Sequence, residues 1–175
     1  KNAVIKVLEE TSPNILHGYP NNLGFEDVRL ALALQCNKLH GTDYNENNIV
    51  MTTGAAAALN IILKSIINPG DEVVVFAPYF GEYRAYAGNY DGKIVEISPN
   101  KETFQPNLEE FEKKLTEKTK AVIINTPNNP TGVIYSAETL TKIGGILKAK
   151  EEEIGHPIYI ISDEPYRELF YGDFN

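Results

Sequence analysis

The sequence predicts an α/β fold built on a largely parallel sheet, and three observations lead to this prediction. Short apolar segments alternate with segments of helical periodicity along the chain, which is the pattern of strand–helix–strand units. Several expected strands, among them residues 71–78 and 121–125, are apolar almost throughout, as strands are when both faces of a parallel sheet are covered. Polar or aromatic residues follow four of the strands, at the edge where such sheets bind ligands.

The N-terminal half predicts two helices and a short strand. A helix is expected from Phe25 to Leu39, with Gly41 as its C-terminal stop. Residues 49–54, IVMTTG, form an apolar run that predicts a short strand. The next helix, which ends at the turn 68–71, is indicated by apolar residues at helical spacing. Those near one face of the two helices are Val28, Leu32 and Leu39, and then Leu59, Ile62, Leu63, Ile66 and Ile67.

The C-terminal half continues the alternation. Strands are expected at 71–78, 93–98, 121–125 and 158–162, and a helix from about Ser136 through Glu153. Between the second and third of these strands, Asn107 can cap a helix with Glu110 at its third position. The apolar residues of that helix expected to point inward are Leu108, Phe111 and Leu115.

Composition excludes several classes of protein. The 175 residues fit about one domain, and a net charge of −8 without a Lys/Arg cluster argues against nucleic acid or an anionic membrane as partner. The single Cys36 excludes an internal disulfide and a Cys-based zinc site, and the three dispersed histidines are expected to be solvated or packed, not metal-bound. No apolar run reaches the length of a membrane span and no signal peptide is evident, so the expected compartment is the cytoplasm.

Two strand ends carry groups suited to a charged ligand. In TTGAAAALN, Gly54 permits a tight turn and the small Ala55 and Ala56 leave the helix amides accessible to an anion; the alternative is an ordinary strand-to-helix turn. The strand IYIIS ends in Asp163-Glu164. Because the chain lacks a G-x-x-x-x-G-K-[ST] loop, a nucleotide-bound Mg²⁺ is not indicated, and Asp163 could instead pair with a cation such as a protonated ring nitrogen. The alternative is a capping or surface acid pair.

Aromatic and amide side chains follow other strands. Pro78-Tyr79-Phe80 places rings at a strand end, where they pack in the core or stack on a flat ligand. Tyr166 could direct its phenol to the same place. After residues 121–125, Pro130 and Pro127 restrict the loop that holds Asn128 and Asn129; we expect Asn129 to contact a ligand and Asn128 to serve the turn. Together these groups fit an anion, a flat ring and a cationic ring atom, which are features of pyridoxal 5′-phosphate.

The chain resembles the class I/II aminotransferases, the fold-type I pyridoxal-phosphate enzymes of the aspartate aminotransferase type. The resemblance extends from about Tyr19 to Gly172 and lies in YPNNLGFEDVR, TTGAAAALN, NPGDEVVVFAPYFGEY, NTPNNPTGVIYS and ISDEPYRELFY, in the family's order and spacing. It implies a three-layer α/β/α large domain with a mostly parallel sheet, here incomplete. Residues 1–48 would be an N-terminal helical segment and 49–175 part of the cofactor-binding large domain.

The resemblance also implies site roles. Ala55 and Ala56 match the positions whose amides hold the cofactor phosphate, and Phe80 matches the ring that stacks on the pyridine. Asp163 matches the aspartate paired with the pyridinium nitrogen. Asn129 matches the asparagine that bonds the ring 3-oxygen and helps receive the substrate carboxylate. Tyr166 matches the tyrosine that reaches the same oxygen. Tyr19 matches the tyrosine that contacts the phosphate bound by the other subunit of a homodimer.

The implied reaction is amino transfer between an amino acid and a 2-oxo acid, but the family's Schiff-base lysine and carboxylate-binding arginine lie beyond the segment that matches here. No lysine before Asn175 has a matching context, so no catalytic residue is assigned and the chain alone is expected to be inactive, as a fragment of such a protein. In the family's sheet, the strand matching 49–54 pairs with a later strand, so open edges are expected, with self-association, repacking or reduced stability as the consequence.

Two alternatives remain open at this point. One is a transcriptional regulator with an aminotransferase-like effector domain, which would carry a basic winged-helix segment upstream. The other is a carbon–sulfur lyase or cyclopropane-forming synthase of the same fold. The amino-acid specificity cannot be read from these residues.

Overall fold

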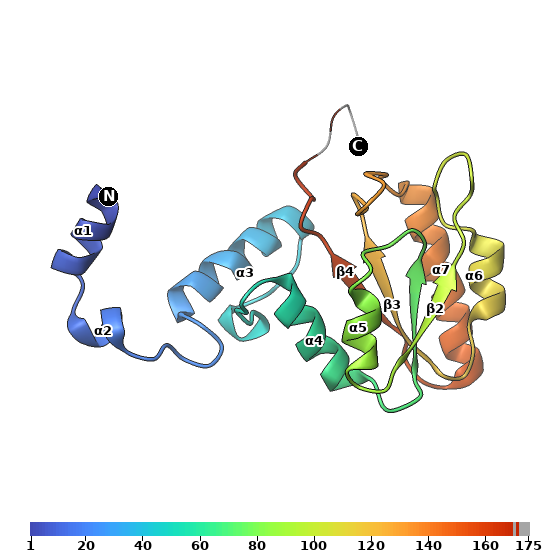
Figure 1. Cartoon of the computed structure of the whole chain (residues 1–175), viewed down its shortest axis with the longest axis horizontal. Coiled ribbons are helices and arrows are strands. Elements are labelled where there is room, and N and C mark those ends of the chain that lie inside the picture. The colour runs from blue at the N-terminus through green and yellow to red at the C-terminus, as the bar shows by residue number, and fades with distance from the viewer. Residues whose placement is uncertain (170, 172–175) are drawn as a thin grey trace. The chain divides into compact units, whose positions relative to one another are not determined.

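A computed structural model describes residues 1–169 and 171 of the chain (Figure 1). By packing, the chain divides into two units, Lys1–Gly54 and Ala55–Asn175. The second unit contains the whole of the described sheet.

The sheet consists of four strands, β1 (Glu72–Phe76), β2 (Lys93–Ile97), β3 (Thr119–Asn125) and β4 (Tyr159–Asp163). Their order is β2-β1-β3-β4, and each neighbouring pair is parallel. The prediction of an α/β fold with a parallel sheet is therefore confirmed.

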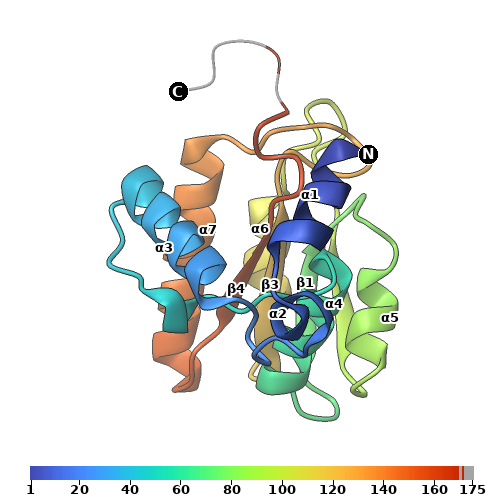
Figure 2. The same ribbon diagram turned by 90° about the vertical axis from the view of Figure 1, so that its left-hand side faces the viewer.

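Helices cover both faces of this sheet: α4 (Ala55–Ile66), α5 (Tyr83–Gly88), α6 (Leu108–Lys114) and α7 (Ala137–Ile154). Figure 2 shows the sheet between α4 and α5 on one side and α6 and α7 on the other. Alternate residues of β1 divide between two cores, because successive side chains of a strand point to opposite faces. Val73 and Val75 pack with α4 and α5, whereas Val74 and Phe76 pack with α6 and α7.

Helix α6 forms as its sequence predicts. The Asn107 side chain accepts a hydrogen bond from the Glu110 amide at 3.1 Å, which satisfies one of the free donors at the helix start. Phe111 and Leu115 are buried and Leu108 packs against the same core. The Glu110 carboxylate does not complete a capping box and instead accepts the Ser98 amide at 2.9 Å.

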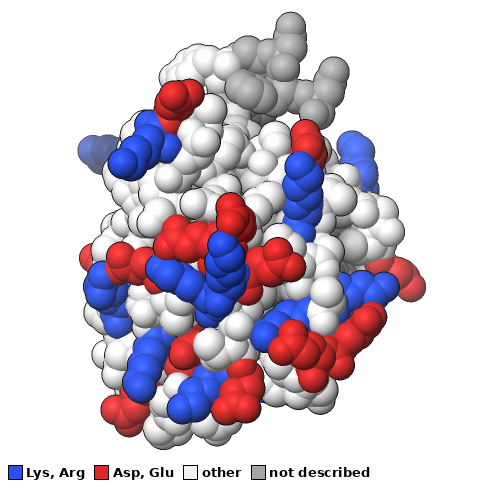
Figure 3. All heavy atoms as spheres, turned by 90° about the vertical axis from the view of Figure 1, so that its right-hand side faces the viewer, with Lys and Arg blue, Asp and Glu red and all other residues white. Residues whose placement is uncertain are grey.

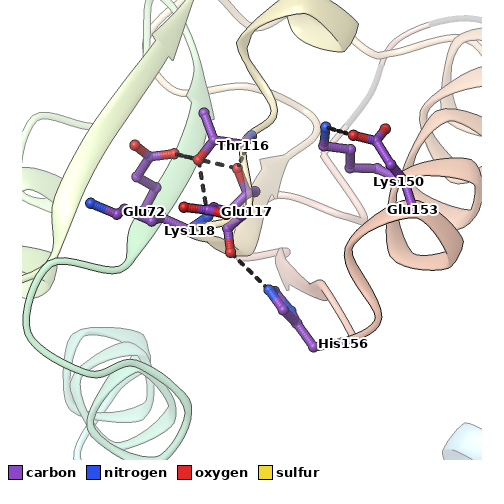
Figure 4. A network of polar contacts seen from close by, with 8 residues as sticks. Glu72, Thr116, Glu117, Lys118, Lys150, Glu153 and His156 are labelled. Atoms are coloured by element: carbon purple, nitrogen blue, oxygen red, sulfur yellow. Dashed lines mark hydrogen bonds and ion pairs between the residues drawn. The ribbon is translucent and has the colours of Figure 1, made fainter.

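A network of polar contacts holds the amino ends of three strands (Figure 4). The Thr116 hydroxyl donates to Glu72, the first residue of β1, at 2.6 Å, and the Thr116 amide donates to the Thr119 hydroxyl at the start of β3 at 2.9 Å. His156 Nε2, just before β4, lies 2.9 Å from the Glu117 carbonyl oxygen. The segments that lead into β3 and β4 thus hold the amino ends of β1, β3 and β4 together.

Strand β4 lies at one edge of the described sheet. Its Ile160 is 52% exposed and Tyr159 is also exposed, so this edge is open within the part of the chain that the structure describes. The self-association expected from such an edge stays a prediction.

The first unit contains α1 (Asn2–Glu10), α2 (Pro13–His17), α3 (Glu26–His40) and the short 3₁₀ turn η1 (Glu46–Asn48). Helix α3 ends at Gly41 with φ +65°, as predicted. The side chain of Arg29 is buried and donates to the carbonyl oxygens of Gly24 and Glu46.

One expectation for this unit is wrong. Residues 49–54 form no strand in the structure, because an apolar run becomes a strand only where a neighbouring strand pairs with its backbone; here the Met51 amide donates to the Leu23 carbonyl in a loop. In α3 the apolar Val28, Leu32 and Leu39 are exposed, whereas Arg29 and Ala33 are buried.

On the face of the molecule drawn in Figure 3, acidic and basic side chains are interleaved. Ion pairs one helical turn apart include Lys113 with Glu109 on α6 and Lys142 with Glu138 on α7. Over residues 1–169 and 171, no helix combines the length and the apolar character needed to cross a membrane.

Candidate functional site

A cavity of about 250 Å³ lies at the carboxyl end of the sheet, where β1, β3 and β4 end and α4 begins. Its walls include every residue of the second unit that the family resemblance matches to a cofactor-binding position. The lining residues are Ala55, Ala56, Leu59, Phe80, Glu82, Tyr86, Asn125, Asn129, Asp163, Pro165 and Tyr166. Segments separated by more than a hundred positions are therefore brought together as the strand-end prediction requires.

The start of α4 supplies a site for negative charge. Ala55 and Ala56 are the first two residues of this 12-residue helix and are exposed. The first amides of a helix have no partner inside it, and the helix dipole adds partial positive charge at this end. Methyl side chains do not cover these amides, so an anion in the cavity can approach them.

Phe80 follows β1 and is held by a cluster of rings. Its ring meets that of Tyr83 edge-on, with centroids 5.8 Å apart, and the ring of Tyr79 stacks on that of Tyr83 with centroids 6.2 Å apart. The Tyr79 hydroxyl donates to Glu96 of β2 at 2.6 Å. The loop that presents Phe80 to the cavity is thus fixed to the sheet.

The loop after β3 separates its two asparagines. Asn128 is 6% exposed, and its side-chain oxygen accepts the Thr131 hydroxyl at 2.8 Å and the Thr131 amide at 3.2 Å. Its backbone carbonyl accepts the Gly132 amide at 2.7 Å, and Gly132 has φ +72°. These contacts agree with the prediction that Asn128 serves the turn, whereas Asn129 lines the cavity.

Asp163 is the last residue of β4 and pairs in register with Asn125 of β3. Its carboxylate oxygen Oδ2 accepts the Tyr83 hydroxyl at 2.5 Å, and its backbone carbonyl accepts the Asn125 side chain at 2.8 Å. Asp163 is therefore held at the cavity wall through its carboxylate by Tyr83 and through its backbone by Asn125.

Tyr166 lies in the turn after β4, is 37% exposed and lines the same cavity. Tyr19 belongs to the first unit, between α2 and α3, and its side chain is fully exposed. Its predicted contact with a second subunit stays a prediction.

Sequence reasoning missed four residues at this cavity. Asn125 donates to Asp163 and also accepts the Asn129 amide at 2.6 Å, so it joins β3, β4 and the loop. Tyr83 bonds to Asp163, and Tyr86 donates to Glu82, which raises the pKa of Tyr86 to about 12. In the sequence, only their positions could have indicated Asn125 and Tyr83, since Asn125 ends an apolar strand and Tyr83 follows Phe80 by three residues.

A wider hollow of about 630 Å³ lies on the other side of the loop and shares Asn129 and Tyr166 with the cavity. Its walls contain no carboxylate and no helix start among the described residues. The smaller cavity carries the complementary charges, so it is the better candidate for binding.

The cavity can hold one end of a ligand at the start of α4, a flat ring against Phe80 and a protonated ring atom at Asp163. Asn129 and Tyr166 add donors for an oxygen substituent. This combination matches a phosphorylated heteroaromatic ring.

Comparison with known proteins agrees with this description of the cavity. The family model "Aminotransferase class I and II" matches residues 1–175. The chain is 37% identical over 174 residues to a probable aspartate/prephenate aminotransferase of Aquifex aeolicus. This match covers 99% of the chain and 42% of that protein. It is 40% identical over 146 residues to a probable kynurenine–oxoglutarate transaminase of Saccharomyces cerevisiae, covering 77% of the chain and 32% of that protein.

A solved structure of an aminotransferase from Eubacterium rectale superposes with a TM-score of 0.94 at 38% identity, over 99% of this chain and 44% of that one. The chain thus spans less than half the length of these relatives. Enzymes of the family in general depend on pyridoxal 5′-phosphate. With the fold, the cavity and a match over residues 1–175, the chain belongs to the class I and II aminotransferase family.

Proposed function

We propose that the protein is a pyridoxal-phosphate-dependent aminotransferase that moves an amino group between an amino acid and a 2-oxo acid. The observation that carries this proposal is the single cavity that gathers a helix start, an aromatic ring, an anchored carboxylate and two polar donors. Because the family's lysine is not assigned in this chain, the activity is proposed for the intact protein.

The donor set fits the cofactor group by group. The dianionic phosphate suits the amides of Ala55 and Ala56, and the planar pyridine ring suits the face of Phe80. The Asp163 carboxylate suits a protonated ring nitrogen, because an opposite charge nearby favours the charged form. When bound, pyridoxal 5′-phosphate supplies an electron sink for the charge that develops at the substrate α-carbon.

The chain's own residues would orient the cofactor and the substrate and polarise the cofactor ring. Asp163 would hold a proton at the ring nitrogen, which deepens the electron sink. Asn129 and Tyr166 would donate to the ring 3-oxygen, and Asn129 would also receive the substrate carboxylate. Leu59 and Pro165 are apolar parts of the wall, and apolar walls strengthen these interactions by excluding water.

A homodimer is part of the proposal, since Tyr19 would reach the phosphate bound by the other subunit. The cytoplasm is the proposed compartment. A lyase or a regulator is not favoured, because the relatives named above are aminotransferases or transaminases. The names of these relatives point to aspartate, prephenate and kynurenine as the compounds to test first.

The test measures amino transfer and cofactor absorbance together. The intact protein, loaded with pyridoxal 5′-phosphate, is mixed with aspartate or kynurenine and a 2-oxo acid such as prephenate. We expect the visible absorbance of the cofactor to change with the accepted donor and the new amino acid to form. Asp163→Ala should lower the transfer rate by roughly tenfold to a hundredfold, since a hydrogen bond to a charged group contributes about 1.5–3 kcal/mol. Near-normal transfer by Asp163→Ala would refute its assigned role, and no transfer with any donor would refute the proposed reaction.

A further inference from the structure

Tyr83 is a buried tyrosine that bonds directly to the central carboxylate of the cavity. It is the first residue of α5, its side chain is 1% exposed, and its hydroxyl lies 2.5 Å from Asp163 Oδ2. The two residues are 80 positions apart in sequence, so the contact depends on the completed fold. It is one of the few polar contacts that join α5 to β4.

The phenol of Tyr83 has little freedom to turn away. Tyr79 stacks on one face of its ring with an interplanar angle of 6°, and Phe80 meets the ring at 79°. Burial and the hydrogen bond to Asp163 both raise the pKa of Tyr83 well above its ordinary value. Both effects favour the protonated hydroxyl, which donates to Asp163.

This donation leaves Asp163 with one oxygen for a ligand. A carboxylate offers two oxygens, and Oδ2 is occupied by Tyr83. In the described part of the chain, Oδ1 accepts no hydrogen bond, while the residue lines the cavity. Asn125 fixes the backbone of Asp163. The freedom that remains is rotation of the Asp163 side chain, and the hydrogen bond from Tyr83 restricts this rotation.

We propose that Tyr83 is a positioning residue, which locks the Asp163 carboxylate so that its free oxygen faces the ring nitrogen of the bound cofactor. This inference rests on the proposed function. It goes further by assigning the alignment of the ring-nitrogen contact to a residue that does not touch the ligand. A purely structural tyrosine would support the fold but would not distinguish a ring nitrogen from a ring carbon.

The test compares two ligands that differ only at this atom. One is pyridoxamine 5′-phosphate, which binds without a covalent bond, and the other is its 1-deaza analogue, which has carbon in place of the ring nitrogen. Dissociation constants are measured by calorimetry for the intact wild-type protein and for Tyr83→Phe, which keeps the ring and removes the hydroxyl. The readout is the ratio of the two constants.

We expect the wild-type protein to prefer the nitrogen-containing ligand by roughly tenfold to a hundredfold, which is the contribution of a hydrogen bond between charged groups. Tyr83→Phe should lower this ratio at least about fivefold while leaving the affinity for the deaza analogue unchanged. In an Asp163→Asn background, Tyr83→Phe should change the ratio no further. Tyr135→Phe, the same change in a buried tyrosine of the opposite core, is the control and should preserve the ratio.

Two results would overturn the inference. An unchanged ratio in Tyr83→Phe would show that Asp163 needs no such support, and an equal loss of affinity for both ligands would assign Tyr83 a structural role only. A wild-type protein that does not discriminate between the ligands would instead refute the role of Asp163 in the proposed function, and the inference with it.

Discussion

Removing the Asn125 side chain should weaken both the fold and the ring-nitrogen contact. Asn125 is 5% exposed, donates to the Asp163 carbonyl at 2.8 Å and accepts the Asn129 amide at 2.6 Å. It is thus the link that fixes two cavity residues, on β4 and on the loop after β3, to one another.

The cost of Asn125→Ala follows from the groups it leaves without partners. An orphaned donor or acceptor costs about 1–3 kcal/mol when buried, and two groups are orphaned here. Asn129 and Asp163 both line the cavity, where water can replace part of the lost contact. We therefore expect a loss of about 2–3 kcal/mol in the free energy of unfolding, near the low end of the sum.

Urea denaturation measures this loss as a lower midpoint with an unchanged slope. The same variant should reduce the preference for pyridoxamine 5′-phosphate over its 1-deaza analogue, because Asp163 is no longer fixed. Asn128→Ala is the matched control, since Asn128 is as deeply buried but its side chain bonds only to Thr131 in its own loop. It should destabilise the protein yet keep the ligand preference.

The result that would refute this reasoning is an Asn125→Ala protein that loses less than about 0.5 kcal/mol, the range of surface substitutions. A full loss of stability with an unchanged ligand preference would show that Asn125 supports the fold but not the site. Asn125→Asp separates the two bonds further, because it keeps an acceptor for Asn129 and replaces the donor to Asp163 with an oxygen.

Two more predictions concern the fold. Phe111→Ala should cost about 3–5 kcal/mol in urea denaturation, because Phe111 is fully buried with its ring centroid 5.3 Å from that of Phe76; the exposed Phe104 is the control, and an equal loss in Phe104→Ala would contradict the assignment of the core. The pKa of Tyr86 is raised to about 12 by its hydrogen bond to Glu82, and that of Tyr135 to about 12 by burial. A raised pKa contributes stability that is complete below the unfolded value of about 10 and is lost as pH rises through the folded value, so the protein should lose stability between about pH 10 and 12. Ultraviolet titration should show these tyrosines ionising after the exposed ones; ionisation near pH 10 without unfolding would be the contrary result.

The strands and longer helices of the second unit could be predicted because their sequence pattern is local. The apolar run of β3 and the Asn107 cap of α6 need only neighbouring residues to be recognised. Helix α5 could not be predicted, since its six residues include Gly88 and so short a helix is stabilised by packing rather than propensity. Residues 49–54 show the opposite error, because apolar character indicates a strand but not whether a partner strand is paired with it.

Several residues that line the cavity could be predicted from the sequence, whereas the residues that support them could not. Phe80, Asn129 and Asp163 lie at or just after strand ends, and parallel strands bring their carboxyl ends to one edge. Nothing in the sequence indicates that Tyr83 bonds to Asp163 or that Asn125 joins two strands, because such contacts depend on the order and register of the strands.

Asn128 is buried and Asn129 is half-buried, and their hydrogen bonds separate the two asparagines of the loop further. The side chain of Asn128 is used within the turn, where Thr131 donates to its oxygen twice, so that oxygen is already saturated. Asn129 is held through its backbone amide by Asn125, and over residues 1–169 and 171 its side-chain amide makes no hydrogen bond. A side chain whose backbone is fixed while its polar atoms remain available is preorganised for a ligand. The same division holds for Asp163, with Oδ2 bonded to Tyr83 and Oδ1 available, so the cavity combines rigid supports with unused bonding capacity at the two positions where the proposed cofactor requires it.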